Sequence, residues 1–186
     1  MRGMNRVRLL LGALLLLAAA APGAAAAQET PEAVARRYFE SMRAANWTAN
    51  VALMHPEALA SFKQIFVQLG TGIGPEAVQE LFGTDPAGLE RMSGEQVYTT
   101  FMQKVMGQFG GLGEMMAGME AEVVGHVPEG AEQAHVVYRM TMEMAGMSMN
   151  QMQVISLKRD GGTWKVLLTG DMANLGAMFR AEAPEP

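Results

Sequence analysis

The sequence predicts an α+β fold in which N-terminal helices pack on a curved four-stranded antiparallel meander sheet. Apolar residues recur at helical spacing as far as Val105, whereas from about Met119 they alternate with polar ones. Short turn-forming segments separate the alternating stretches, so consecutive strands are expected to be antiparallel neighbours.

Residues 1–27 have the pattern of a secretory signal peptide. Arg2, Arg6 and Arg8 precede an uncharged run, Leu9–Ala21, and small residues continue to Ala27. A basic start, a short apolar run and an Ala-x-Ala site are typical of an export signal. The run is shorter than the roughly 20 residues of a spanning helix. We therefore expect a protein exported to the periplasm or secreted, with one domain over residues 28–180.

Three helices are predicted before Gly70. The first begins at Thr30-Pro31, where Thr caps the helix and Pro occupies the first position without losing a hydrogen bond. The second covers residues 47–54 and ends before Pro56. His55, directly before this proline, is expected to cap the next helix. The third follows it. Its apolar stripe consists of Leu59, Phe62, Ile65, Phe66 and Leu69.

Residues 70–118 are expected to combine a loop, a fourth helix and a glycine hinge. Up to Met92 the glycines and prolines favour a loop with one or two helical turns. Ser93 to Gln96 then forms a capping box, followed by apolar residues at positions 97, 101 and 105, which predicts a fourth helix. The glycines from Gly107 to Gly113 predict a hinge.

Four strands are predicted over residues 119–127, 133–144, 147–159 and 163–170. A turn at Ala145-Gly146 pairs Met144 with Met147 and Met142 with Met149. This register places one apolar set on the inner face of the sheet and polar residues, such as Arg139 and Thr141, on the other. The inner set includes Val136, Tyr138, Met140, Met142, Met144, Met147, Met149, Ile155, Leu157, Trp164 and Val166.

Two segments resemble the NTF2-like (SnoaL-like) superfamily. The opening from Pro31 to Phe66, with Ala45-Asn46-Trp47, resembles the first helices of such domains. The ending from Val154 to Val166, with Trp164-Lys165-Val166 after a glycine turn, is similar to their last hairpin. Residues 70–118 fit the family pattern least well and are expected to be a variable insert. The resemblance implies a cone with an apolar pocket between sheet and helices. The superfamily that it implies includes isomerases, dehydratases, cyclases and non-catalytic binding proteins. No active-site motif of these enzymes is matched in this sequence.

Methionine is unusually abundant, with 18 residues in the chain. Flexible thioether side chains fill irregular cores and line permissive apolar pockets. The predicted ligand-binding residues are Tyr138, Met140, Met142, Met144, Met147, Met149 and Trp164. A second hypothesis is a Cu(I) site, because thioethers are soft ligands. Its candidates are the opposed pairs Met142–Met149 and Met144–Met147, with Met115, Met116 and Met119 as a further cluster.

A third hypothesis is a cone enzyme that uses an acid–base residue. The candidates are Tyr38, His55, Tyr138 and Asp171, of which Tyr138 lies on the predicted apolar face. His126 and His135 flank the first hairpin, and the three histidines share no metal-ligand spacing. The sequence assigns no catalytic residue, no metal ligand and no cofactor.

Charge and composition exclude several classes of protein. Without the three leader arginines, 11 basic side chains face 19 acidic ones and the net charge becomes −8, which disfavours nucleic acid and anionic membranes. The absence of cysteine excludes disulfides and thiol catalysis. We expect a non-catalytic binding domain, monomeric or homodimeric, that holds a small apolar ligand or a protein partner. The tail, residues 181–186, is expected to be disordered.

Overall fold

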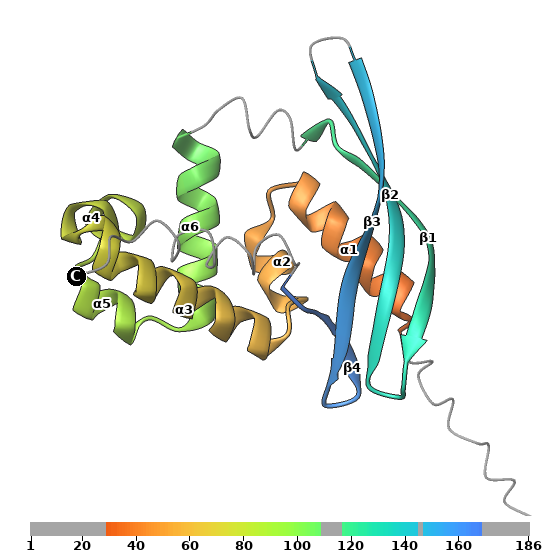
Figure 1. The fold of residues 1–186 in the computed structure, drawn as a ribbon, viewed down its shortest axis with the longest axis horizontal. Helices are drawn as coiled ribbons and strands as arrows, with labels where there is room; N and C mark the ends of the chain where they lie inside the picture. The colour runs from red at the N-terminus through yellow and green to blue at the C-terminus, as the bar shows by residue number, and fades with distance from the viewer. Residues whose placement is uncertain (1–28, 109–116, 145–146, 169–186) are drawn as a thin grey trace, which may run out of the picture.

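The computed structural model describes residues 29–108, 117–144 and 147–168. The predicted signal peptide, most of the predicted hinge, Asp171 and the predicted tail lie outside these residues. The described part confirms the α+β prediction, with helices followed by a four-stranded antiparallel meander in the order β1-β2-β3-β4. Figure 1 shows the sheet on one side of the molecule, with α1 lying across one of its faces and the other helices beyond it.

The first three helices begin where the sequence predicts, but the second ends at Ala52 rather than Met54 and the third continues past Gly70. Helix α1 (Pro31–Arg43) begins at Thr30, whose hydroxyl accepts a hydrogen bond from the amide of Ala33 at 3.3 Å. Helix α2 (Trp47–Ala52) is capped by Asn46, whose side chain accepts from the amide of Ala49. Helix α3 (Pro56–Ile73) is capped by His55 and runs beyond Gly70. Each cap satisfies a backbone N–H that the first turn leaves unpaired.

The loop predicted before Met92 is wrong, because this stretch is mostly helical. It holds the end of α3, α4 (Pro75–Phe82) and α5 (Pro86–Arg91). The prolines and glycines mark helix ends here, since Pro75 and Pro86 open helices and Gly83 ends α4 in the left-handed conformation. Helix α6 (Gly94–Gln108) then follows a capping box in which Ser93 and Gln96 exchange both expected hydrogen bonds.

The sheet confirms the predicted register. It consists of β1 (Glu120–Glu129), β2 (Gln133–Met144), β3 (Met147–Asp160) and β4 (Thr163–Val166), and Met144 pairs with Met147 and Met142 with Met149. The β3–β4 turn is made by Gly161 and Gly162, both at positive φ. A bulge between Val123 and Gly125 bends β1, which the sequence did not indicate.

One hydrophobic core joins the helices to the sheet. On the helical side, the aromatic rings of α3, α4 and α6 pack against one another, with Phe66 and Phe101 4.6 Å apart at their centroids. On the sheet side, the ring centroids of Phe39 of α1 and Tyr138 of β2 lie 4.5 Å apart. Helix α1 thus packs on the inner face of the sheet and leaves the end of the β2–β3 hairpin uncovered (Figure 1). Its position decides which of the predicted inner residues are buried.

Candidate functional site

The β2–β3 hairpin projects beyond the rest of the sheet and beyond α1 (Figure 1). Strand β1 pairs with β2 only as far as Thr141, and β4 pairs with β3 only from Leu157 to Asp160. Among the residues that the structure describes, 142–144 and 147–149 therefore pair only with each other, and we call this two-stranded end the methionine ribbon. An isolated two-stranded hairpin is marginally stable in water, so the ribbon gains from any surface that covers it.

The concave side of the ribbon is apolar and partly open. Met142 and Met149 are paired directly opposite each other. Met140 lies two residues before Met142 on β2 and therefore on the same face. Met140 and Met142 are half-buried, whereas 41% of Met149 is exposed. The backbones of Met144 and Met147 pair at the tip, as predicted, but their side chains lie outside the described part.

Two glutamines that the sequence analysis did not place on this face belong to it. Gln151 pairs with Met140, and Gln153 pairs with Tyr138. The Gln153 amide nitrogen donates to the side-chain oxygen of Gln151 at 3.3 Å. The two-residue alternation of β3 was the signal that could have located them. Their side chains make the inner face polar where the methionine ribbon joins the rest of the sheet.

Tyr138 and Trp164 belong to the hydrophobic core. Tyr138 is buried beside Phe39, and its hydroxyl donates to the side-chain oxygen of Gln153 at 2.7 Å. Trp164 is buried under the guanidinium of Arg159, which lies 4.4 Å from the ring centroid. Among the predicted ligand-binding residues, the structure thus keeps Met140, Met142 and Met149 together at a reachable surface and separates Tyr138 and Trp164 from it.

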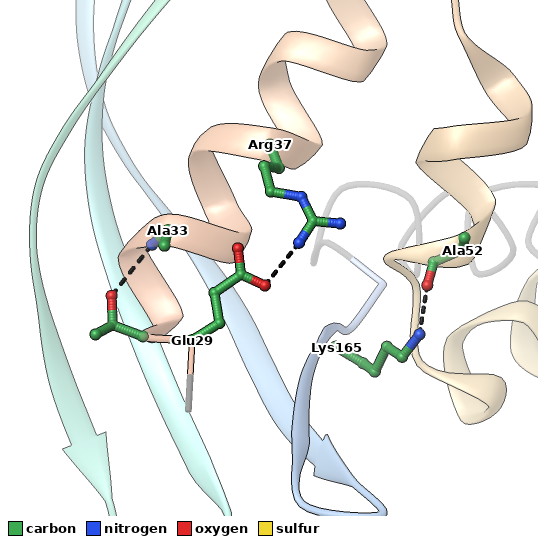
Figure 2. Close-up of polar contacts among 6 residues, drawn as sticks. Glu29, Ala33, Arg37, Ala52 and Lys165 are labelled. Carbon is green, nitrogen blue, oxygen red and sulfur yellow. Dashed lines mark hydrogen bonds and ion pairs between the residues drawn. The ribbon is translucent and has the colours of Figure 1, made fainter. Parts of the chain in front are cut away.

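Two of the cavities in the described part lie between the helices and the sheet. One of about 270 Å³ lies between α1 and β1, lined by Arg36, Phe39, Glu40, Arg43, Met119, Ala121, Glu122 and Val123. The other, of about 680 Å³, lies between α2, α3, the start of α6 and the end of the sheet. Its two lysines already hold helix ends: Lys63 donates to the carbonyl of Glu90 and Lys165 to that of Ala52. Figure 2 shows the contact of Lys165, and also the ion pair of Arg37 with Glu29. Cations at the ends of helices stabilise their unpaired carbonyls.

The acid–base candidates Tyr38, His55 and Tyr138 occupy structural positions, and Asp171 lies outside the described residues. Burial raises the pKa of Tyr38 to about 12, and its hydroxyl is hydrogen-bonded to that of Tyr98 inside the helical layer. The ring nitrogen Nδ1 of His55 accepts the amide of Glu57 at 3.1 Å, which confirms its predicted role as a helix cap. The hydroxyl of Tyr138 contacts an amide oxygen, which cannot act as a base.

The other histidines pair with acidic side chains. His126 Nδ1 lies 2.5 Å from a carboxylate oxygen of Glu32, and this contact joins β1 to α1. His135 bridges the Ser156 hydroxyl and the Glu129 carboxylate, at 2.9 and 2.7 Å. Within residues 29–108, 117–144 and 147–168, no three His, Asp or Glu side chains gather where they could hold a metal ion.

Comparison of the chain with known protein families found no match. Comparison with curated proteins found no relative either. In the described part of the chain, none of the helices combines the length and the apolar character needed to cross a bilayer. The assignment of a function therefore depends on the geometry described above.

Proposed function

We propose that this is an exported, non-catalytic binding protein that holds an apolar segment of a protein partner against the concave face of the methionine ribbon. The NTF2-like cone suggested by the sequence is part of this proposal. The observation that carries it is the position of Met142 and Met149, which face each other on a two-stranded hairpin that α1 does not cover.

The filled base of the concave face favours a protein partner over an enclosed small molecule. Phe39 and Tyr138 pack against each other between α1 and the sheet, and the cavity beside them measures about 270 Å³, below the roughly 300–1,000 Å³ of a typical ligand pocket. The part of the inner face that α1 leaves uncovered lies at the end of the β2–β3 hairpin (Figure 1). Burying a methionine side chain contributes about 1.5–3 kcal/mol, and its flexibility accommodates partners of varied shape.

Site-specific photocrosslinking tests the proposal. A photoreactive residue replaces Met149 on the concave face or Val124 on the opposite face, where 57% of Val124 is exposed. In the cells that make the protein, we expect a heterologous adduct from position 149, none from position 124, and loss of the adduct when Met142 is changed to Ser. Equal adducts from both positions, no adduct, or an adduct of a second copy alone would refute the proposal.

A Cu(I) site is the second candidate, favoured by the direct pairing of Met142 with Met149 beside Met140. Leucine separates the two functions, because it keeps the apolar surface and removes the thioether sulfur. If the ribbon binds copper, the double variant Met142→Leu, Met149→Leu loses Cu(I) binding in a chelator competition titration. If it binds a protein segment, the same variant keeps the crosslinked adduct. Binding of Cu(I) no tighter than about micromolar by the unmodified protein excludes the metal site.

A further inference from the structure

Strand β3 has an open edge between Met147 and Val154. Its neighbour on that side, β4, pairs only from Leu157, and one more backbone bond joins Leu167 to the Ser156 carbonyl. Among the described residues, no strand pairs with this side of β3 between Met147 and Val154. The edge therefore offers backbone groups to a further strand.

The hydrogen-bond alternation of an antiparallel pair identifies which groups these are. The amide of Arg159 donates to the carbonyl of Glu132 across the β2–β3 pair, so odd-numbered residues of β3 direct their N–H and C=O groups toward β2. Even-numbered residues direct theirs the other way, as Ser156 does toward Leu167. On the open edge they are Ser148, Asn150, Met152 and Val154.

This edge has none of the features by which sheets block further pairing. From Met144 to Leu157 the chain has no charged residue and no proline, and the β2–β3 register runs without a bulge. The opposite edge of the sheet, β1, has a bulge after Val123, Pro128 near its end, and the carboxylates of Glu120 and Glu122. Charges, prolines and bulges are the usual protection of edge strands. One edge is thus protected and the other is not.

We propose that the open edge of β3 pairs antiparallel with the same edge of a second copy of this chain, so that the two sheets become one. One register pairs the outward backbone N–H and C=O groups of all four edge residues. With the two-fold axis at Gln151, Ser148 pairs with Val154 of the other copy and Asn150 with Met152, because the four edge residues are symmetric about position 151.

Of the surfaces by which two copies could meet, the edge of β3 opposes their approach least by charge. The chain has a net charge of −5, so two copies repel each other over most of their surfaces. The edge of β3 is the neutral stretch where that repulsion is least. In the proposed register, Met152 lies opposite Asn150 of the other copy and Val154 opposite Ser148. Both side chains, each 55% exposed on the outer face, become partly buried at the junction.

Sedimentation equilibrium of the protein as isolated, with three variants, tests this interface. Met152→Pro removes an N–H that points to the open edge and leaves the β2–β3 bonds in place. Met152→Lys adds charge at the same position. The matched control Val124→Lys adds the same charge on β1, at a residue that is 57% exposed.

We expect a dimer whose dissociation constant rises about 10-fold or more in both Met152 variants, since each change occurs twice in a two-fold interface. Val124→Lys leaves the dimer unchanged. Amide exchange should slow at Ser148, Asn150, Met152 and Val154 in the dimer, and quicken on dilution. Thermal unfolding shows that the variants are folded.

Three results would overturn the proposal. A protein that is monomeric at all concentrations has no such interface. A dimer that Val124→Lys dissociates packs through the faces of the sheets. Edge amides that stay protected in a monomer are covered by the same chain. The crosslinking experiment on the methionine ribbon is read from a heterologous adduct, so either proposal can fail without the other.

Discussion

The hydroxyl of Tyr98 on α6 donates a hydrogen bond of 2.6 Å to the side-chain oxygen of Asn50 on α2, and the Asn50 side chain is completely buried. The Asn50 amide nitrogen in turn donates to the Ser41 hydroxyl and to the Tyr38 carbonyl on α1. Three helices thus meet at one asparagine. No buried side-chain nitrogen or oxygen in the described part lacks a partner, so this cluster is fully satisfied.

Replacing Asn50 by Leu should lower the free energy of unfolding by about 2–4 kcal/mol, because it leaves buried hydroxyl and carbonyl groups without partners. Tyr98→Phe removes one partner and should cost about 1–2 kcal/mol. Urea denaturation measures both, and the double variant should lose less than the sum. Thr48→Ala, on the exposed side of α2, is the control and should stay within about 0.5 kcal/mol. Normal stability of Asn50→Leu would contradict the structural role of the cluster.

Alkaline pH should destabilise the protein through Tyr38. Burial raises the pKa of this hydroxyl from 10.0 to about 12, and burial likewise raises the pKa of Tyr98. Because the unfolded chain releases these protons first, the stabilisation is complete below about pH 10 and declines between about pH 10 and pH 12. Tyrosinate absorbance should therefore follow unfolding, whereas the chain in urea should titrate near 10. Ionisation of these buried hydroxyls at an ordinary pKa in the folded protein would refute the prediction.

The pair of Glu32 and His126 should contribute to stability above acid pH. Partial burial alone would raise the pKa of Glu32, but the hydrogen bond with His126 and those with the backbone and Thr30 outweigh it, so the pKa lies below its ordinary 4.5. This stabilisation is present above pH 4.5 and is lost as the pH falls through the lowered pKa.

Glu32→Gln should accordingly cost about 0.5–1 kcal/mol near neutral pH, and little at a pH below the pKa of Glu32, where the carboxyl is protonated in both states. Urea denaturation across this range measures the difference. Glu76→Gln, which changes an exposed glutamate in the first turn of another helix, is the control. An equal cost of Glu32→Gln at all pH values would show that the carboxylate charge is not involved.

Gly94 should not tolerate a side chain. A Cβ at this position would lie 2.6 Å from the carbonyl oxygen of Leu59, so α3 and α6 would have to separate. Gly94→Ala should therefore lower stability by about 1–3 kcal/mol despite the better helix propensity of alanine. Gly107, in the last turn of the same helix, has nothing within 4 Å of its Cβ position, and Gly107→Ala should be neutral or stabilising by up to about 1 kcal/mol. Thermal unfolding compares the two, and an equal response would exclude the contact as the cause.

Local signals predicted most of the secondary structure. Thr30, His55 and the Ser93–Gln96 box mark helix starts, and the β2–β3 register follows from alternation about the Ala145-Gly146 turn. The same reasoning failed before Met92, where Pro75, Gly83 and Pro86 were read as loop residues but are helix boundaries. Proline and glycine mark ends of helices as readily as loops, and only the surrounding contacts distinguish the two.

The polar outer face of the sheet was only partly foreseen. Arg139 and Thr141 lie there as predicted, but Met152 and Val154 are also exposed on it. The neutral stretch from Met144 to Leu157 was visible in the sequence. That it forms an open edge could not be seen, because strand order and the short length of β4 decide which backbone groups stay unpaired.

The sequence by itself determined the order of helices and strands, their antiparallel pairing, and the methionines that share one face, because period and turn residues are properties of neighbouring positions. Only the tertiary structure decided that Tyr138 is buried while Met149, on the same face, stays open. That difference depends on where α1 lies across the sheet, and α1 is distant from both strands in the sequence. Burial is set by packing between segments far apart in the chain, and local patterns do not encode it.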